Sequence, residues 1–326
     1  MIKPRLAVLA ILVCYSAPAA AHDPIEYWRT IPSVREFTKP RSFFGKLLDW
    51  VAGPAEGKPE ITRPYSSTED SAGRLFIADP GQKGVHEFDF EKHKYRFLKG
   101  PKGDTMESPI GVLCDAADNL YVSDSVRREI YVYDSQAKFR GRITGPAGSR
   151  LLRPTGLALD RRARKLYVSD TLRHQVLEFG LDGSFTRAIG KHGIAAGQFN
   201  FPTSLAISGD RLYVVDAMNF RIQTFTLQGD YVSSFGKPGD NTGTFQRPKG
   251  IATDSEGNLY VVDGLFETVQ VFDPKGRLLY YFGGSGAHPG QFQLPSGIAI
   301  DPRNVIYVAD SLNRRVQVFH FKRRFE

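Results

Sequence analysis

The chain has 326 residues, of which 41% are hydrophobic and 24% charged, and its formal net charge is +8. This composition excludes a disordered tail protein and a polytopic membrane protein, and two cysteines exclude a disulfide scaffold. The 32 glycines and 20 prolines favour a turn-rich β fold, and the positive charge permits an anionic partner without requiring one.

The first residues are typical of an export signal. Lys3 and Arg5 form a basic start, residues 6–13 are an apolar run too short to span a bilayer, and residues 19–21 are three alanines that suit cleavage. We therefore predict that residues 1–21 are a cleavable signal peptide. The mature protein would be periplasmic or secreted and would have no transmembrane segment.

The two cysteines have separate interpretations. Cys14 lies in the signal, and a lipoprotein signal would place a small residue before it, whereas Val13 stands there. Removal of the signal leaves Cys114 without a partner for an intramolecular disulfide. Cys114 ends the apolar run 111–114, which predicts a buried, inert thiol.

Residues 22–44 are predicted to form an N-terminal arm that precedes a single domain at 45–326. The stretch 45–53 reads like 276–284, and each begins 19 residues before a proline of the repeat described next. This match predicts that residues 46–51 form a β-strand. The alternative is a short amphipathic helix at 42–51, with its apolar side chains on one face.

A motif of the form Tyr-Val-x-Asp recurs six times, with a period of 45–47 residues. Its aspartates are Asp79, Asp124, Asp170, Asp216, Asp263 and Asp310, and a proline recurs in step at Pro64, Pro109, Pro154, Pro202, Pro248 and Pro295. Apolar runs and turn residues alternate within each unit, which predicts four short strands. Four strands in a repeat of this length are typical of a propeller blade. We predict an all-β fold, a six-bladed β-propeller of four-stranded blades.

The units resemble NHL repeats, and the resemblance extends over nearly the whole mature chain. The closest stretches are QFQLPSGIAID at 291–301 and YVADSLNRRVQVF at 307–319. The Asn-His pair of the family is mostly replaced, for example by Asn313-Arg314. The resemblance implies an interaction platform. Some intracellular members bind single-stranded RNA, but the export signal argues against a nucleic-acid partner here.

Closure of the ring needs a further strand, because the last unit ends after its third strand at Phe319. A closed ring leaves no unpaired strand edge. We therefore predict that an N-terminal strand, residues 46–51, completes the last blade.

The repeated aspartates are expected to be structural, because six equivalent carboxylates suit a turn better than a catalytic site. A catalytic zinc needs about three converging ligands, and the stretches after the repeat prolines contain no histidine. Phosphate-loop, nucleophile-elbow and paired-cysteine motifs are also missing. We predict no catalytic residue, no metal and no cofactor. The alternative is a metal-dependent lyase or hydrolase that uses the axial pocket.

The loops after the repeated aspartates are basic and should share one face of the disc. Their candidate binding residues are Arg127, Arg128, Arg173, His174, Arg221, Arg314 and Arg315. The turns on the opposite face are richer in acids. A one-sided positive face attracts anionic partners. The alternative is that these arginines only cover a face or bond to neighbouring carbonyl groups.

The position two residues after the aspartate is apolar in five of the six units. These residues are Val126, Leu172, Met218, Leu265 and Leu312. Exposed apolar groups framed by positive charge would suit a protein or lipid-like partner. The alternative is that they pack under the inter-blade loops, against Phe199, Phe245 and Phe292. The sequence thus favours a non-enzymatic binding propeller with a protein or anionic partner in the cell envelope.

Overall fold

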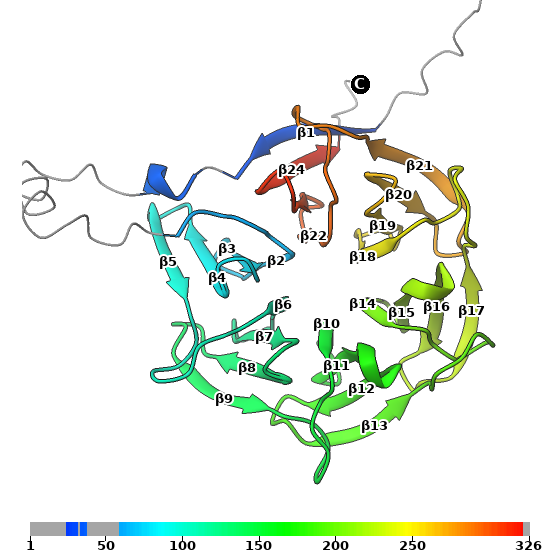
Figure 1. Cartoon of the computed structure of the whole chain (residues 1–326), viewed down its shortest axis with the longest axis horizontal. Coiled ribbons are helices and arrows are strands. Elements are labelled where there is room, and N and C mark those ends of the chain that lie inside the picture. The colour runs from blue at the N-terminus through cyan, green and yellow to red at the C-terminus, as the bar shows by residue number, and fades with distance from the viewer. Residues whose placement is uncertain (1–23, 32, 38–58, 322–326) are drawn as a thin grey trace, which may run out of the picture.

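A computed structural model describes residues 24–31, 33–37 and 59–321. Six four-stranded antiparallel sheets surround a central axis, as Figure 1 shows. The predicted all-β, six-bladed propeller is therefore confirmed. The signal peptide at 1–21 and the predicted strand at 46–51 lie outside the described residues.

Each blade has its strands in sequence order from the axis outward, except the sixth. The strands of the first three blades are β2 (Ser66–Glu69), β3 (Arg74–Asp79), β4 (Gly84–Asp89) and β5 (Lys94–Leu98); β6 (Pro109–Cys114), β7 (Leu120–Asp124), β8 (Glu129–Tyr133) and β9 (Phe139–Ile143); and β10 (Pro154–Asp160), β11 (Lys165–Asp170), β12 (Gln175–Gly180) and β13 (Phe185–Ile189). The strands of the last three are β14 (Pro202–Ser208), β15 (Arg211–Asp216), β16 (Arg221–Thr226) and β17 (Tyr231–Phe235); β18 (Pro248–Thr253), β19 (Leu259–Asp263), β20 (Thr268–Phe272) and β21 (Leu278–Gly283); and β22 (Ile298–Ile300), β23 (Ile306–Asp310), β24 (Arg315–Phe321) and β1 (Ile25–Thr30). Three short 3₁₀ helices are η1 (Val34–Phe37), η2 (Thr171–Arg173) and η3 (Ala217–Asn219).

Burial along a blade follows from its position between two neighbours. Every residue of β7 and of β19 is buried, because adjacent blades cover both faces of a second strand. The outermost strands β13 and β17 are largely exposed. The core therefore consists of layers between blades, built by the apolar second and third strands.

The strand that closes the ring is not the one that the sequence predicted. β1 pairs antiparallel with β24, with Ile25 opposite Phe321 and Thr30 opposite Gln317. The predicted N-terminal closure is confirmed, but the outer-strand position belongs to residues 25–30 and not to 46–51. The ring of Tyr27 lies edge-on to that of Phe319, with centroids 6.0 Å apart. In β1, Ile25 is buried and Tyr27 half-buried against the core while Glu26 and Trp28 are exposed, which suits this outer position, and the match between 45–53 and 276–284 was misleading.

The inter-blade loops are held to the core by three buried aromatic residues. Phe199, Phe245 and Phe292 are fully buried. Each packs on a phenylalanine of a third strand, with centroids 5.4–5.7 Å apart. A side chain in place of Gly190, Gly236 or Gly283 would clash with these rings. These three inter-blade loops are therefore anchored to the core on one face of the disc.

Candidate binding face

One face of the disc carries the loops between the second and third strands, together with the inter-blade loops. We call it the loop face, and its inner loops are residues 80–83, 125–128, 171–174, 217–220, 264–267 and 311–314. All the residues that the sequence proposed as a binding site lie on it. The structure thus brings them to the same side of the molecule.

The six repeated aspartates are the structural basis of this face. All six side chains are fully buried. The carboxylate of Asp124 accepts backbone hydrogen bonds from Glu107 at 2.7 Å and Ser108 at 3.1 Å, and from Val126 and Arg127 in its own loop. Equivalent inter-blade donors are Thr62 and Arg63, Leu152 and Arg153, Asn200, Gln246 and Arg247, and Gln293. The predicted structural role is confirmed, because each carboxylate ties two loops together.

Three of the predicted binding arginines belong to this scaffold. Arg221 and Arg315 donate to the aspartate of their own blade at 2.8 and 2.7 Å. Both also donate to carbonyl oxygens of the preceding inter-blade loop. Arg173 likewise donates to the carboxylate of Asp170 and to the backbone carbonyl of Arg150. For these three the alternative interpretation is correct: the guanidinium groups hold loops together.

The remaining predicted basic residues differ in their availability. Arg127 donates to the Thr105 carbonyl and lies 3.4 Å from a carboxylate oxygen of Asp104. Arg128 and Arg314 are exposed, and neither side chain has a hydrogen bond or ion pair with a described residue. These two arginines are the predicted binding residues whose charge remains available to a partner.

His174 contributes packing and not charge. Its Nδ1 accepts a hydrogen bond from the backbone of Phe201, and its ring lies 4.3 Å from that of His192. Burial and the neighbouring His192 hold the pKa of His174 below its ordinary value. The imidazole is therefore neutral at pH 7.

The five apolar residues stand out from the loop face. The exposed fractions are 62% for Val126, 46% for Leu172, 54% for Met218, 52% for Leu265 and 55% for Leu312. We call these five residues the apolar ring. The alternative that they are buried under the inter-blade loops is wrong, because each of the five is about half exposed.

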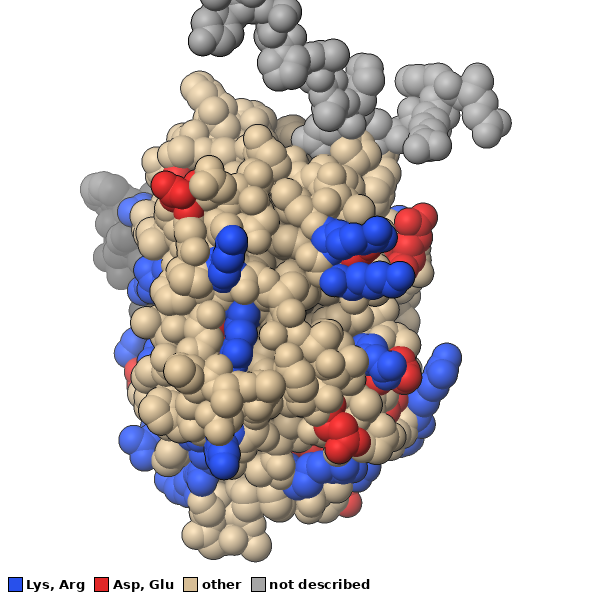
Figure 2. Space-filling model, turned by 90° about the vertical axis from the view of Figure 1, so that its right-hand side faces the viewer, with Lys and Arg blue, Asp and Glu red and all other residues tan. Residues whose placement is uncertain are grey.

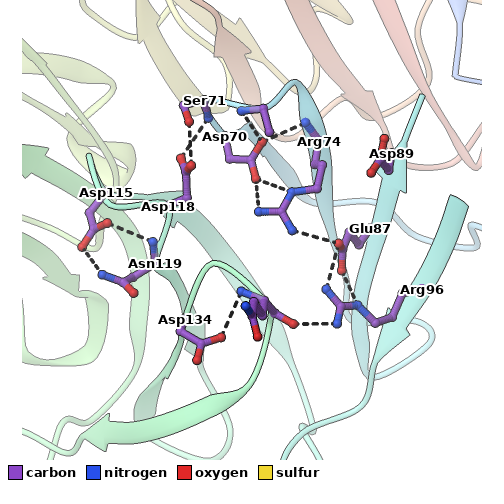
Figure 3. A network of polar contacts seen from close by, with 12 residues as sticks. Asp70, Ser71, Arg74, Glu87, Asp89, Arg96, Asp115, Asp118, Asn119 and Asp134 are labelled. Carbon is purple, nitrogen blue, oxygen red and sulfur yellow. Dashed lines mark hydrogen bonds and ion pairs between the residues drawn. The ribbon is translucent and has the colours of Figure 1, made fainter. Parts of the chain in front are cut away.

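On the opposite face, most acidic residues are bound within turns. Asp70 accepts from Arg74 at 2.6 Å, Arg74 reaches Glu87, and Glu87 in turn pairs with Arg96, as Figure 3 shows. Asp115, Asp254 and Asp301 each accept backbone bonds from residues two and four positions later. Lysines and arginines also occur on the rim, where Figure 2 shows blue side chains more often than red.

The innermost strands line an axial pocket with a cavity volume of about 80 Å³. Gly111, Gly156, Gly250 and Gly297 let these strands approach, because an added Cβ would clash with a carbonyl oxygen of the next blade. Hydroxyl groups complete the ring: Thr155 donates to the Thr203 carbonyl at 2.9 Å, and Ser296 to the Tyr65 carbonyl at 2.8 Å. The lining is thus largely occupied in holding blades together.

One charged residue in the pocket lining, Lys249, was missed by the sequence analysis. It directly follows the repeat proline Pro248, in one of the stretches that contain no histidine and therefore gave no zinc site. Within residues 24–31, 33–37 and 59–321, no group of three or more His, Cys, Asp or Glu side chains could hold a metal ion. Cys114 is buried, as predicted, and burial raises the pKa of its thiol.

Comparisons with known proteins agree on the fold. Residues 159–250 match a family described as a 6-bladed beta-propeller, and residues 292–319 match the NHL repeat. No curated protein matches the chain. In the part of the chain that the structure describes, no helix has the length and apolar character needed to cross a membrane.

Solved structures with this fold have different functions. Virginiamycin B lyase from Staphylococcus aureus is 15% identical, with a TM-score of 0.61 over 80% of this chain and 96% of the lyase. A gluconolactonase from Xanthomonas campestris is 20% identical, with a TM-score of 0.62 over 80% of this chain and 86% of that one. An auxiliary nutrient binding protein from Bacteroides thetaiotaomicron is 15% identical, with a TM-score of 0.62 over 80% and 69%. Identities this low show the fold alone, and a shared fold does not fix function.

Proposed function

We propose that this six-bladed β-propeller, which carries an NHL repeat, is an exported, non-enzymatic binding module that presents its loop face to a protein partner in the cell envelope. The observation that carries the proposal is the apolar ring. Five blades place a large apolar side chain at the same position, and all five are about half exposed. Scattered exposed apolar residues are normal, but a repeated set on one face is typical of an interaction surface.

Magnitudes favour the apolar ring over the charges as the source of affinity. Burial of a large apolar side chain contributes about 1.5–3 kcal/mol, so covering five half-exposed ones would contribute roughly 5 kcal/mol before the costs of association. An exposed ion pair contributes about 0–1 kcal/mol. Arg128 and Arg314 therefore steer an anionic partner surface and increase the association rate, while the apolar ring holds it.

Export is part of the same proposal and is supported by the N-terminal residue pattern. Cleavage after Ala21 would leave β1 intact, since this strand begins at Ile25. The closing strand and the predicted signal therefore do not overlap. Mass spectrometry of the protein recovered from its native host is expected to give His22 as the N-terminus.

The binding proposal is tested by cross-linking and mass spectrometry on the mature protein in its native envelope. The test variant combines Leu172→Ser, Met218→Ser and Leu312→Ser. Because these side chains are half exposed, the fold should be retained, and the captured partner should fall at least tenfold.

The matched control changes three equally exposed apolar residues on the outer strands. These are Val232→Ser, Leu279→Ser and Tyr281→Ser, at exposures of 44%, 47% and 49% in the wild type. The control is expected to capture the partner as the wild type does. Equal capture by both variants would contradict the proposal.

A further inference from the structure

The residue before the repeat proline is an arginine in alternate blades. Arg63, Arg153 and Arg247 precede the innermost strands of blades one, three and five. Figure 1 shows these blades spaced around the axis, with β2, β10 and β18 innermost. All three side chains are exposed, and none has a hydrogen bond or ion pair with a described residue. The backbone amides of these three residues donate to the buried aspartates, but their side chains, unlike those of Arg173, Arg221 and Arg315, take no part in the scaffold of the loop face.

Blade five also departs from the repeat inside the pocket. In blades three and six, two hydroxyl groups meet beside the axis: Thr155 with Thr171 at 2.7 Å and Ser296 with Ser311 at 2.8 Å. The equivalent residues of blade five are Lys249 and Gly264. A Cβ on Gly264 would lie 2.9 Å from the Cε of Lys249, so the glycine leaves the space in which the lysine stem lies. In blade five, Lys249 and Gly264 thus replace the hydroxyl–hydroxyl hydrogen bond of blades three and six, and the glycine makes room for the lysine side chain.

The surroundings of Lys249 are positive. Desolvation, followed by the charges of Arg247 and Arg63, lowers the pKa of Lys249 to about 8, against the opposing charge of Asp263. The carboxylate of Asp263 already accepts four backbone hydrogen bonds, from Gln246, Arg247, Leu265 and Phe266. The same arginines and Arg153 act on the phenol of Tyr65, which also lines the pocket. Each arginine directly precedes an innermost strand at the end of an inter-blade loop, so the three arginines and Lys249 lie at the loop-face end of the axial pocket.

We propose that this axial mouth binds a small oxyanion carrying two or more negative charges, such as a phosphate group, through Arg63, Arg153, Arg247 and Lys249. Guanidinium groups donate paired hydrogen bonds to such oxygens, and a lysine supplies a compact charge. The pocket below is narrow, and its hydroxyl groups already donate to carbonyls, so the anion is held at the mouth. This site goes beyond the protein-binding role of the apolar ring and does not depend on it.

The test is isothermal titration of the mature full-length protein with pyrophosphate, at constant ionic strength set with chloride. The axial variant combines Arg63→Gln, Arg153→Gln and Arg247→Gln. Binding is expected for the wild type and should be at least tenfold weaker in this variant. Wild-type affinity should also fall between pH 7 and pH 9, as Lys249 loses its proton, and Lys249→Gln should remove that part of the pH dependence.

The matched control removes the same charge from three exposed lysines in the inter-blade loops, through Lys102→Gln, Lys191→Gln and Lys237→Gln. Its affinity is expected to stay within twofold of the wild type. Equal weakening in both variants would show diffuse attraction to a basic surface and would overturn the site. Absence of binding to the wild type at millimolar pyrophosphate would also overturn it. Neither result would affect capture of a protein partner by the apolar ring.

Discussion

At the scale of single residues, the fourth residue after each repeated aspartate combines a constant backbone conformation with a variable side chain. It holds Lys83, Arg128, His174, Phe220, Glu267 and Arg314, and all six have a left-handed φ between 53° and 61°. This conformation costs a residue other than glycine about 1–2 kcal/mol. The hydrogen bonds to the buried aspartates hold the loop in place despite that cost. Because the backbone is constant while the side chain varies, this position can carry specificity without changing the fold.

Lys249 gives a prediction about stability at the same scale. Lys249→Met should raise the free energy of unfolding at pH 7 by about 1 kcal/mol, because it removes the desolvation of a charged group; the figure allows for partial solvent screening. Chemical denaturation of the mature protein and the variant measures it. A variant less stable than the wild type at pH 7 would contradict this account of Lys249.

The pH dependence of that difference has a definite sign. The pKa of Lys249 is about 8 in the folded protein and 10.5 in the unfolded chain. Between these values the unfolded chain binds more protons, so the stability of the wild type rises with pH. The advantage of Lys249→Met should therefore be fully present below pH 8 and shrink as the pH rises towards 10.5.

At the scale of elements, β1 is the part of the fold on which closure depends. Ile25 is 3% exposed and belongs to the core cluster between blades five and six. Ile25→Ala should lower the free energy of unfolding by about 2–4 kcal/mol, as expected for a buried aliphatic side chain. Thermal or chemical denaturation measures it.

Trp28 in the same strand provides the control. It is 50% exposed, so Trp28→Ala should change stability by much less than Ile25→Ala. Similar losses in both variants, or no loss in either, would contradict the assignment of β1 as the outer strand that packs Ile25 into the core beside the last blade.

The element scale also shows what the sequence could and could not predict. Six copies of one motif predicted the blade count and the strand order correctly, because every copy has the same pattern of apolar runs and turn residues. The closing strand occurs once, so no internal copy supports it, and the resemblance between 45–53 and 276–284 does not correspond to the outer-strand position that β1 occupies. β1 has only six residues, and its adjacent Tyr27 and Trp28 interrupt an alternation of apolar and polar residues, so the sequence pattern does not indicate a strand there.

At the scale of the whole molecule, the location of the candidate residues on one face could be predicted from the sequence, but their contacts could not. Spacing placed the binding candidates on one face, but a spacing pattern says nothing about partners. Arg314 and Arg315 are neighbours in the sequence, yet Arg315 donates to Asp310 and loop carbonyls while the Arg314 side chain has no partner among the described residues. The sequence likewise left open whether the apolar ring is exposed or packs on Phe199, and the structure shows Phe199 packed on Phe225 and the ring about half exposed.

The most direct test of the loop face as a binding surface uses the two methionines beyond Met1. Met106 is fully buried and Met218, in the apolar ring, is 54% exposed. Peroxide oxidation, read by mass spectrometry, should therefore modify Met218 quickly and Met106 slowly in the purified mature protein. In the native envelope, a partner on the loop face should protect Met218 at least severalfold, with Met106 unchanged as the internal reference. Equal oxidation of Met218 in the envelope and in the purified protein would contradict the proposed binding face.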